Sequence, residues 1–85
     1  MSTHSTPAPT GAIPLSQLAI GQTGFIQALH VKNPLQRQQL LETGVLLNVG
    51  IRVIQKLAHN MLFRANGRLI AMDLGTAANI WIEPA

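Results

Sequence analysis

The chain has 85 residues, of which six are basic and three are acidic, so its formal net charge is +3. This length is enough for one small domain, and so small a charge excess does not by itself indicate nucleic-acid binding. Because the chain has no cysteine, it has neither a disulfide framework nor a thiolate metal site. Nearly half of the residues are hydrophobic but only three are aromatic, which predicts a core of aliphatic side chains.

The N-terminal segment differs in composition from the rest of the chain. Residues 1–12 are rich in Ser, Thr, Pro and Ala and are expected to form a flexible tail before a single domain at residues 13–85. The tail lacks the basic start and the apolar stretch of a signal peptide. No apolar run approaches the roughly 20 residues of a membrane-spanning helix, so we expect a cytoplasmic protein.

The first part of the domain is expected to hold a short edge element and a bent strand. Residues 13–18 fit either an edge strand or a short turn. A strand is expected over residues 24–31, where the apolar side chains do not alternate cleanly. This pattern is typical of a bulged or strongly bent strand, as small barrels require.

The clearest local signal in the chain predicts a helix. Asn33 can act as the N-cap, Pro34 suits the first helical position, and Gln36 can complete a capping box. We expect a helix from Pro34 to about Thr43, ended by Gly44 in the left-handed conformation. Three leucines are expected to anchor so short a helix: Leu35, Leu40 and Leu41.

From residue 49 onward the chain is expected to be β. Asn66-Gly67 is a strong two-residue hairpin signal that would pair Phe63 with Ile70. In the preceding hairpin, a loop of odd length over residues 58–60 would keep Val53 beside Phe63, since a one-residue slip flips every side chain. With a last strand near residues 79–83, these elements predict a small closed or nearly closed barrel. The expected core is Leu18, Ile26, Leu40, Leu41, Val45, Val53, Phe63, Ile70, Met72, Ile80 and Ile82.

Three segments carry a resemblance to a known family. Residues 18–26 read L-x-x-G-x-x-G-x-I, residues 37–45 read R-x-x-L-x-x-x-G-V, and residues 67–82 contain G-x-x-x-A-M followed by apolar positions. In this order and spacing they resemble the FeoA family. The resemblance implies a mainly β, SH3-like barrel with one short helix. It also implies that the protein assists the GTPase-linked ferrous iron transporter FeoB from the cytoplasmic side, with recruitment to the inner face of the membrane.

One departure from the family concerns a turn. Where the family often has Pro-Gly after the helix, this chain has Leu47-Asn48. Asparagine tolerates positive φ next best after glycine, so we expect the turn to be kept.

The titratable residues do not form a recognisable catalytic or metal site. No nucleophile–base spacing, paired carboxylates or phosphate loop is visible, so we expect no enzymatic activity. The histidines lack the spacing of a helical metal site. His30 and His59 are the surface candidates for an ion, since one exposed imidazole can share a metal with a neighbouring molecule. We expect no required cofactor and only adventitious or weak binding of a divalent metal.

Basic residues gather in the hairpin region. Arg52, Lys56, Arg64 and Arg68 have no acidic residue between them, and the alternation places the first three on the outward face. One interpretation is a solvated strand face whose basic side chains discourage edge pairing. The other is docking to an acidic patch on a partner, or to phosphates at the inner membrane surface.

Aliphatic residues are interleaved with the basic ones. Ile54, Leu62 and Leu69 are expected on the same outward face, and an apolar strip rimmed by Arg and Lys is typical of a protein interface. Scattered surface aliphatics are also common, so both interpretations stay open. The strip favours a homodimer at high protein concentration. The candidate residues for contact with FeoB are therefore Arg52, Ile54, Lys56, Leu62, Arg64 and Leu69.

Two functions from different classes are compatible with the sequence. The first is a protein-interaction module that regulates the transporter. The alternative is a nucleic-acid-binding or transcription-regulator-associated SH3-like barrel, because that fold supports many functions. The chain has no helix-turn-helix partner and few aromatics for base stacking, so no nucleic-acid partner is expected. The single tryptophan, Trp81, either caps the barrel edge or lies in the interface.

Overall fold

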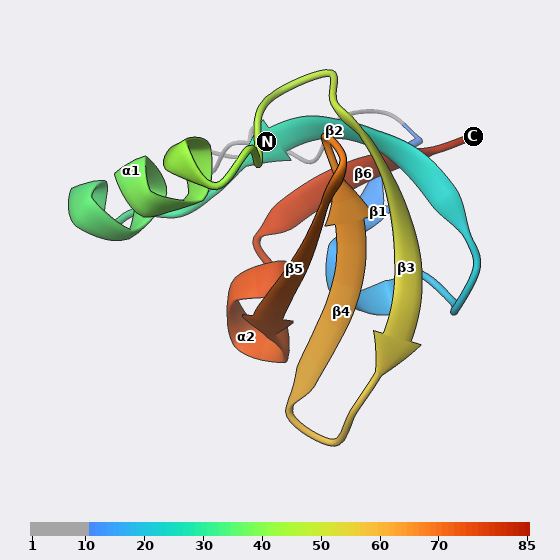
Figure 1. Cartoon of the computed structure of the whole chain (residues 1–85). Helices are drawn as coiled ribbons and strands as arrows, with labels where there is room; N and C mark the ends of the chain where they lie inside the picture. Colours follow the sequence, from blue (N-terminus) through green and yellow to red (C-terminus); the bar gives the residue numbers. More distant parts are fainter. Residues whose placement is uncertain (1–10) are drawn as a thin grey trace, which may run out of the picture.

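The six strands of the described residues form one antiparallel sheet that curls around a core (Figure 1). This computed structural model describes residues 11–85, so most of the tail predicted for residues 1–12 lies outside the described residues. The strand order is β1-β6-β2-β3-β4-β5. The elements in chain order are β1 (Ile13–Pro14), the 3-10 turn η1 (Leu15–Gln17), β2 (Thr23–Leu29), α1 (Pro34–Glu42), β3 (Gly50–Lys56), β4 (Asn60–Ala65), β5 (Arg68–Asp73), α2 (Leu74–Ala77) and β6 (Ile80–Pro84).

The core lies on the concave side of the sheet and follows the strand alternation. Every predicted core residue on a strand is buried except Ile70, which is partly buried against the same cluster. Among the largest fully buried side chains, two were not predicted: Leu15, which lies in η1, and Met61 of β4. Residues 13–18 combine both expected forms, an edge strand and a turn.

The register of the hairpins is as predicted, but one loop is not. Phe63 lies opposite both Val53 and Ile70. The loop between β3 and β4 is not residues 58–60 as expected, because β4 already begins at Asn60, whose carbonyl accepts from Leu57 N–H over 2.8 Å. The register is restored by a bulge between Val53 and Gln55, where one extra residue on β3 has no partner on β4.

The turn residues take the backbone conformations that the sequence predicts. Asn66 and Gly67 have φ values of 52° and 75°, which fit a two-residue hairpin turn. Asn48 has a φ of 69°, so the turn after the helix is kept without a glycine. In the first motif, Gly24 is needed for close approach: a Cβ there would clash with Ile82 Cγ2 and lie 2.6 Å from the carbonyl oxygen of Glu83. Strand β2 also has a register shift, as its irregular pattern predicts.

Helix α1 begins as predicted but is anchored less than predicted. The Asn33 side chain accepts hydrogen bonds from the backbone N–H groups of the second and third helical residues, and Gly44 has a φ of 101°. Gln36 does not close a capping box; its side chain donates to Thr76 Oγ1 over 3.1 Å. The predicted burial of Leu35 and Leu41 is wrong, since they are 66% and 40% exposed. The helix extends away from the barrel, so one side of it meets solvent (Figure 1).

The sequence analysis did not predict the four-residue helix α2. Asp73 caps it, accepting from Thr76 N–H and from Thr76 Oγ1–H, both over 2.8 Å. These hydrogen bonds, first that of the hydroxyl, hold the pKa of Asp73 below its ordinary value. No helix in residues 11–85 is long and apolar enough to cross a membrane.

Candidate partner-binding face

One row of side chains crosses the convex side of four adjacent strands. Thr23 of β2 lies opposite Arg52 of β3, which lies opposite Arg64 of β4, which in turn lies opposite Leu69 of β5. Both arginines are exposed, and the residues before and after each of them on its own strand are buried. Two like charges directly opposite on neighbouring strands destabilise the sheet unless a counter-charge lies between them. A negatively charged group placed beside these two arginines would therefore be bound favourably.

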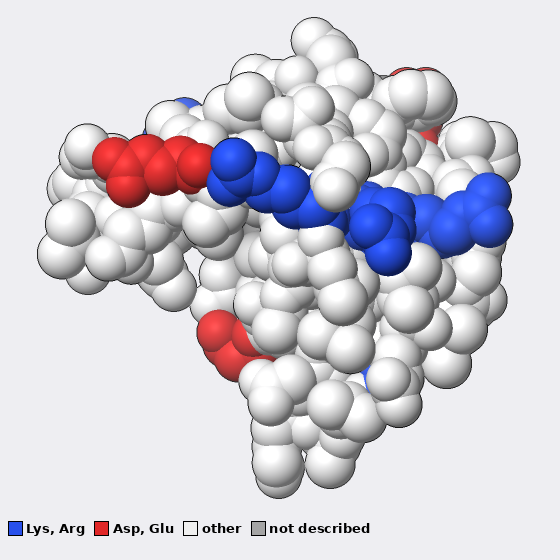
Figure 2. Space-filling view, viewed as in Figure 1, with Lys and Arg blue, Asp and Glu red and all other residues white. Residues whose placement is uncertain are grey.

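The surface view shows how far this charge extends. In Figure 2 a band of blue side chains crosses the region of β3, β4 and β5, and no red side chain interrupts it. One red patch adjoins the end of the band on the side of helix α1, and the other red patches in this view lie apart from the band. The arginines of these strands are Arg52, Arg64 and Arg68, and all three are exposed. We call Arg52, Arg64, Arg68 and Leu69 the arginine face.

Lys56, which the sequence placed on this face, lies elsewhere. The bulge at Ile54 inverts the alternation of β3, so Lys56 lies opposite the fully buried Met61. The side chain is half-buried, and its ammonium group donates to the carbonyl oxygen of Ser16 over 2.8 Å. The prediction that Lys56 points outward is wrong, and its contact ties the end of β3 to η1.

The predicted aliphatic candidates are on the outer side of the barrel to different extents. Leu69 is 54% exposed and adjoins Arg64 across the strands. Ile54, the extra residue of the bulge, is 38% exposed. Leu62 is half-buried, in the row of Gln55 and Ala71. The structure thus brings together Arg52, Arg64 and Leu69, with Ile54 and Leu62 one step along the strands.

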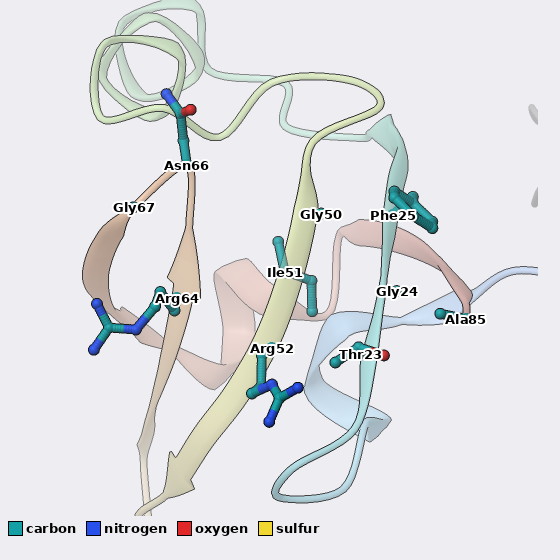
Figure 3. Close-up of a pocket in the computed structure, with 10 residues that line it drawn as sticks. All are labelled: Thr23, Gly24, Phe25, Gly50, Ile51, Arg52, Arg64, Asn66, Gly67 and Ala85. Atoms are coloured by element: carbon teal, nitrogen blue, oxygen red, sulfur yellow. The ribbon is translucent and has the colours of Figure 1, made fainter.

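An open groove of about 400 Å³ adjoins the two facing arginines. Its floor includes Gly50 of β3, which lies between Phe25 of β2 on one side and the Asn66-Gly67 turn on the other (Figure 3). Arg52 and Arg64 line the same groove, and none of its lining side chains in the described chain is acidic. The groove therefore combines a mainly apolar lining with two positive charges.

The residues that shape this groove, Phe25 and Gly50, were not predicted as site residues from the sequence. Phe25 is 46% exposed although it is one of two phenylalanines in the chain. Gly50 has no positive φ, so its backbone does not require glycine. A Cβ at Gly50 would lie 3.6 Å from Phe25 Cε1 and would begin to fill the groove. A glycine at the start of a strand, with no turn to explain it, was the signal available in the sequence.

The two histidines of the described residues, His30 and His59, belong to no cluster that could hold a metal ion. His30 is half-buried, and its Nδ1 accepts a hydrogen bond from Trp81 Nε1–H over 2.8 Å. His59 is exposed at the tip of the β3–β4 hairpin. Within residues 11–85 no group of three or more His, Cys, Asp or Glu side chains could hold a metal ion. The tilted ring pair of Trp81 and His30, with centroids 5.9 Å apart, thus ties β6 to the segment before α1.

Comparison of the chain with known protein families shows which family it belongs to. Residues 13–84, almost the whole described domain, match the FeoA domain. The chain belongs to the FeoA family. Membership supports involvement in ferrous iron transport, and no protein of curated function matches the chain.

Solved structures with the same fold include both FeoA proteins and repressors. An iron uptake regulatory protein, FeoA, has a TM-score of 0.78 at 20% identity, over 87% of this chain and 99% of that chain. Stenotrophomonas maltophilia FeoA, complexed with zinc and described as an SH3 domain protein, has a TM-score of 0.67 at 20% identity, over 82% and 88%. A manganese-dependent transcriptional repressor in complex with manganese has a TM-score of 0.83 at 21% identity, over 93% of this chain but 39% of that chain. At these identities the likeness shows the SH3-like fold alone.

Proposed function

We propose that this FeoA-family chain is a non-enzymatic accessory protein of bacterial ferrous iron uptake that contacts the cytoplasmic part of a FeoB-like, GTPase-linked transporter. The observation that carries the proposal is the arginine face, where three exposed arginines on adjacent strands adjoin an exposed leucine. Positive rim charges steer an acidic partner into register, and the neighbouring apolar surface supplies contact that is retained after docking.

The titratable residues support a role in binding rather than catalysis. Between residues 11 and 85, the acidic and histidine side chains form no cluster that could hold a catalytic metal. Asp73 is occupied with capping α2, and His30 with Trp81. In this proposal, GTP hydrolysis and iron handling belong to the transporter.

The alternative of a barrel attached to a transcription regulator draws only on the shared fold. The repressor match covers 39% of that chain at 21% identity. Three arginines on one face are also few for a surface that would have to neutralise a phosphate backbone.

Binding kinetics against the solubilised transporter, or its GTPase domain, at two salt concentrations test the proposal. Replacing both Arg52 and Arg64 with Glu is expected to slow association and to weaken its salt dependence, because the steering charges are reversed. Leu69→Asp is expected mainly to speed dissociation. Circular dichroism serves as the folding control, since all three side chains are exposed.

A matched control separates the arginine face from charge in general. Arg37→Glu on helix α1, outside the sheet, makes the same charge change as Arg52→Glu alone, and it should bind like the wild type if the arginine face docks. If the sheet variants are folded and bind like the wild type, the docking face lies elsewhere. If only Arg37→Glu binds more weakly than the wild type, the docking face comprises the helix and the turn at Gly44.

A further inference from the structure

We propose that the groove over Gly50 is a binding site for a short acidic segment of a protein partner, in which a carboxylate lies against Arg52 and Arg64 and an apolar side chain two residues away packs on Phe25. The inference rests on the proposed function in one respect: it takes the transporter's cytoplasmic part as the source of that segment. Beyond the proposed function, the inference specifies where the partner segment binds and which side chains that segment carries.

The arginine pair determines the charged part of the ligand. Arg52 and Arg64 are direct cross-strand partners, and both line the groove. Guanidinium groups hold carboxylates through two parallel hydrogen bonds, and they do so best where no other acid competes. A carboxylate placed between the two arginines would also relieve the repulsion of like charges that face each other across strands.

The opposite side of the groove determines the apolar part. Phe25 is nearly half exposed, and its ring adjoins the position that a side chain on Gly50 would occupy. Because Gly50 has ordinary strand geometry, the missing side chain is explained by the open floor and not by the backbone. An apolar side chain from a partner can therefore reach both the Phe25 ring and the Gly50 backbone.

The shape favours a peptide segment over a small ligand. The groove is open on its solvent side, whereas small-molecule sites bury most of their ligand in an enclosed cleft. Its lining comes from β2, β3, β4, the turn after β4 and Ala85, which follows β6, so the groove crosses several strands. In an extended segment, side chains two residues apart face the same side. A segment with an acidic and an apolar side chain at this spacing therefore matches an arginine pair beside an apolar floor, since Arg52 and Gly50 are also two residues apart on β3.

The probe is a blocked peptide of about eight residues that repeats Glu-Ser-Leu-Ser, so that Glu and Leu share one face when the peptide is extended. It is titrated into isotope-labelled full chain and followed by NMR chemical shifts. The control peptide repeats Gln-Ser-Leu-Ser. We expect the Glu peptide to shift amide signals around Phe25, Gly50, Arg52 and Arg64, and the Gln peptide to bind more weakly. Arg52→Gln and Arg64→Gln should each weaken the Glu peptide about two- to fivefold, as expected for exposed ion pairs.

A steric variant tests the groove independently of charge. Gly50→Val places a branched side chain on the floor, and it should weaken the peptide more than Arg37→Gln, the matched loss of charge on α1. The variants' NMR spectra report whether the barrel is folded. If Gly50→Val does not fold, Gly50→Ala, whose added Cβ meets Phe25 only at ordinary contact distance, provides the same test on a smaller scale.

Several outcomes would overturn the inference. Equal binding of the Gln peptide would remove the role of the arginines, and shifts confined to α1 would place the site elsewhere. Inorganic phosphate or GDP that shifts the same signals more strongly than the peptide would make the groove an anion or nucleotide site.

The outcome can be separated from that of the proposed function. If the peptide enters the groove but the transporter does not bind the chain, the transporter partnership fails and the groove stands. If the transporter binds and folded Gly50→Val binds it equally well, the groove inference fails and the proposed function stands.

Discussion

Strand β4 and helix α1 differ in how much of their side-chain surface the fold covers. In β4, Met61 and Phe63 are fully buried, whereas none of the nine residues of α1 is buried. Yet α1 has the sharper local signals, with an N-cap asparagine, a proline at the first position and a glycine after the end. The comparison teaches that capping residues decide where a helix begins and ends, whereas burial depends on what the rest of the chain places against it.

Truncation of the largest core side chain should give the largest effect. Phe63→Ala is expected to lower the free energy of unfolding by about 3–5 kcal/mol, because it leaves a cavity in the middle of the sheet. Denaturant unfolding measures this loss. The matched truncation on the helix, Leu35→Ala, should change it by less than about 0.5 kcal/mol, as for other exposed positions. A loss below about 1 kcal/mol for Phe63→Ala would contradict the burial of β4.

The cap of α2 should have an intermediate effect that depends on pH. Asp73→Ala is expected to cost about 1 kcal/mol at neutral pH, since Thr76 loses the acceptor of two hydrogen bonds. Because the folded pKa of Asp73 is lowered, its contribution is fully present above the unfolded pKa, near 4, and is lost as the pH falls through the folded value. Thermal melts at pH values from about 7 to 2 measure this dependence.

The control for this titration is Asp73→Asn, which keeps an acceptor oxygen but cannot ionise. Its stability should fall less than that of the wild type when the pH is lowered, because the other two carboxylates, Glu42 and Glu83, are common to both proteins. Parallel pH profiles for the wild type and Asp73→Asn would show that the cap does not depend on the charge of Asp73.

The cap of α1 should have the smallest effect on the whole protein. Asn33→Ala removes the acceptor of two helix N–H groups, so amide exchange within α1 should become about fivefold faster. The melting temperature of the barrel should change little, since the helix contributes no buried side chain to the core. Asn33→Asp keeps the cap and serves as the control. If Asn33→Ala destabilises the barrel in thermal melts by as much as it destabilises the helix in amide exchange, then α1 belongs to the same cooperative unit as the barrel. The partly buried Leu40 would be the contact that couples them.

The sequence by itself determined the features that rest on local chemistry or on strand alternation. The start of α1, the Asn66-Gly67 turn, the positive φ of Asn48 and the pairing of Phe63 with Ile70 all follow from residue types and spacing. The alternation also placed Arg52 and Arg64 outward. Arg52 precedes the bulge in β3, and Arg64 lies on β4, where the extra residue of the bulge does not occur. The FeoA-like order of glycines and leucines then indicated the SH3-like barrel.

Only the tertiary structure decided where the alternation breaks and what lies across the strands. The bulge at Ile54 turned Lys56 toward Ser16, and no residue pattern in β3 marks that position. The groove likewise needs Phe25, Gly50 and Arg64, which are distant in sequence and meet only because β2, β3 and β4 are neighbours. A bulge is determined by packing on both strands together, and a groove by the strand order, so neither can be read from one segment of the chain.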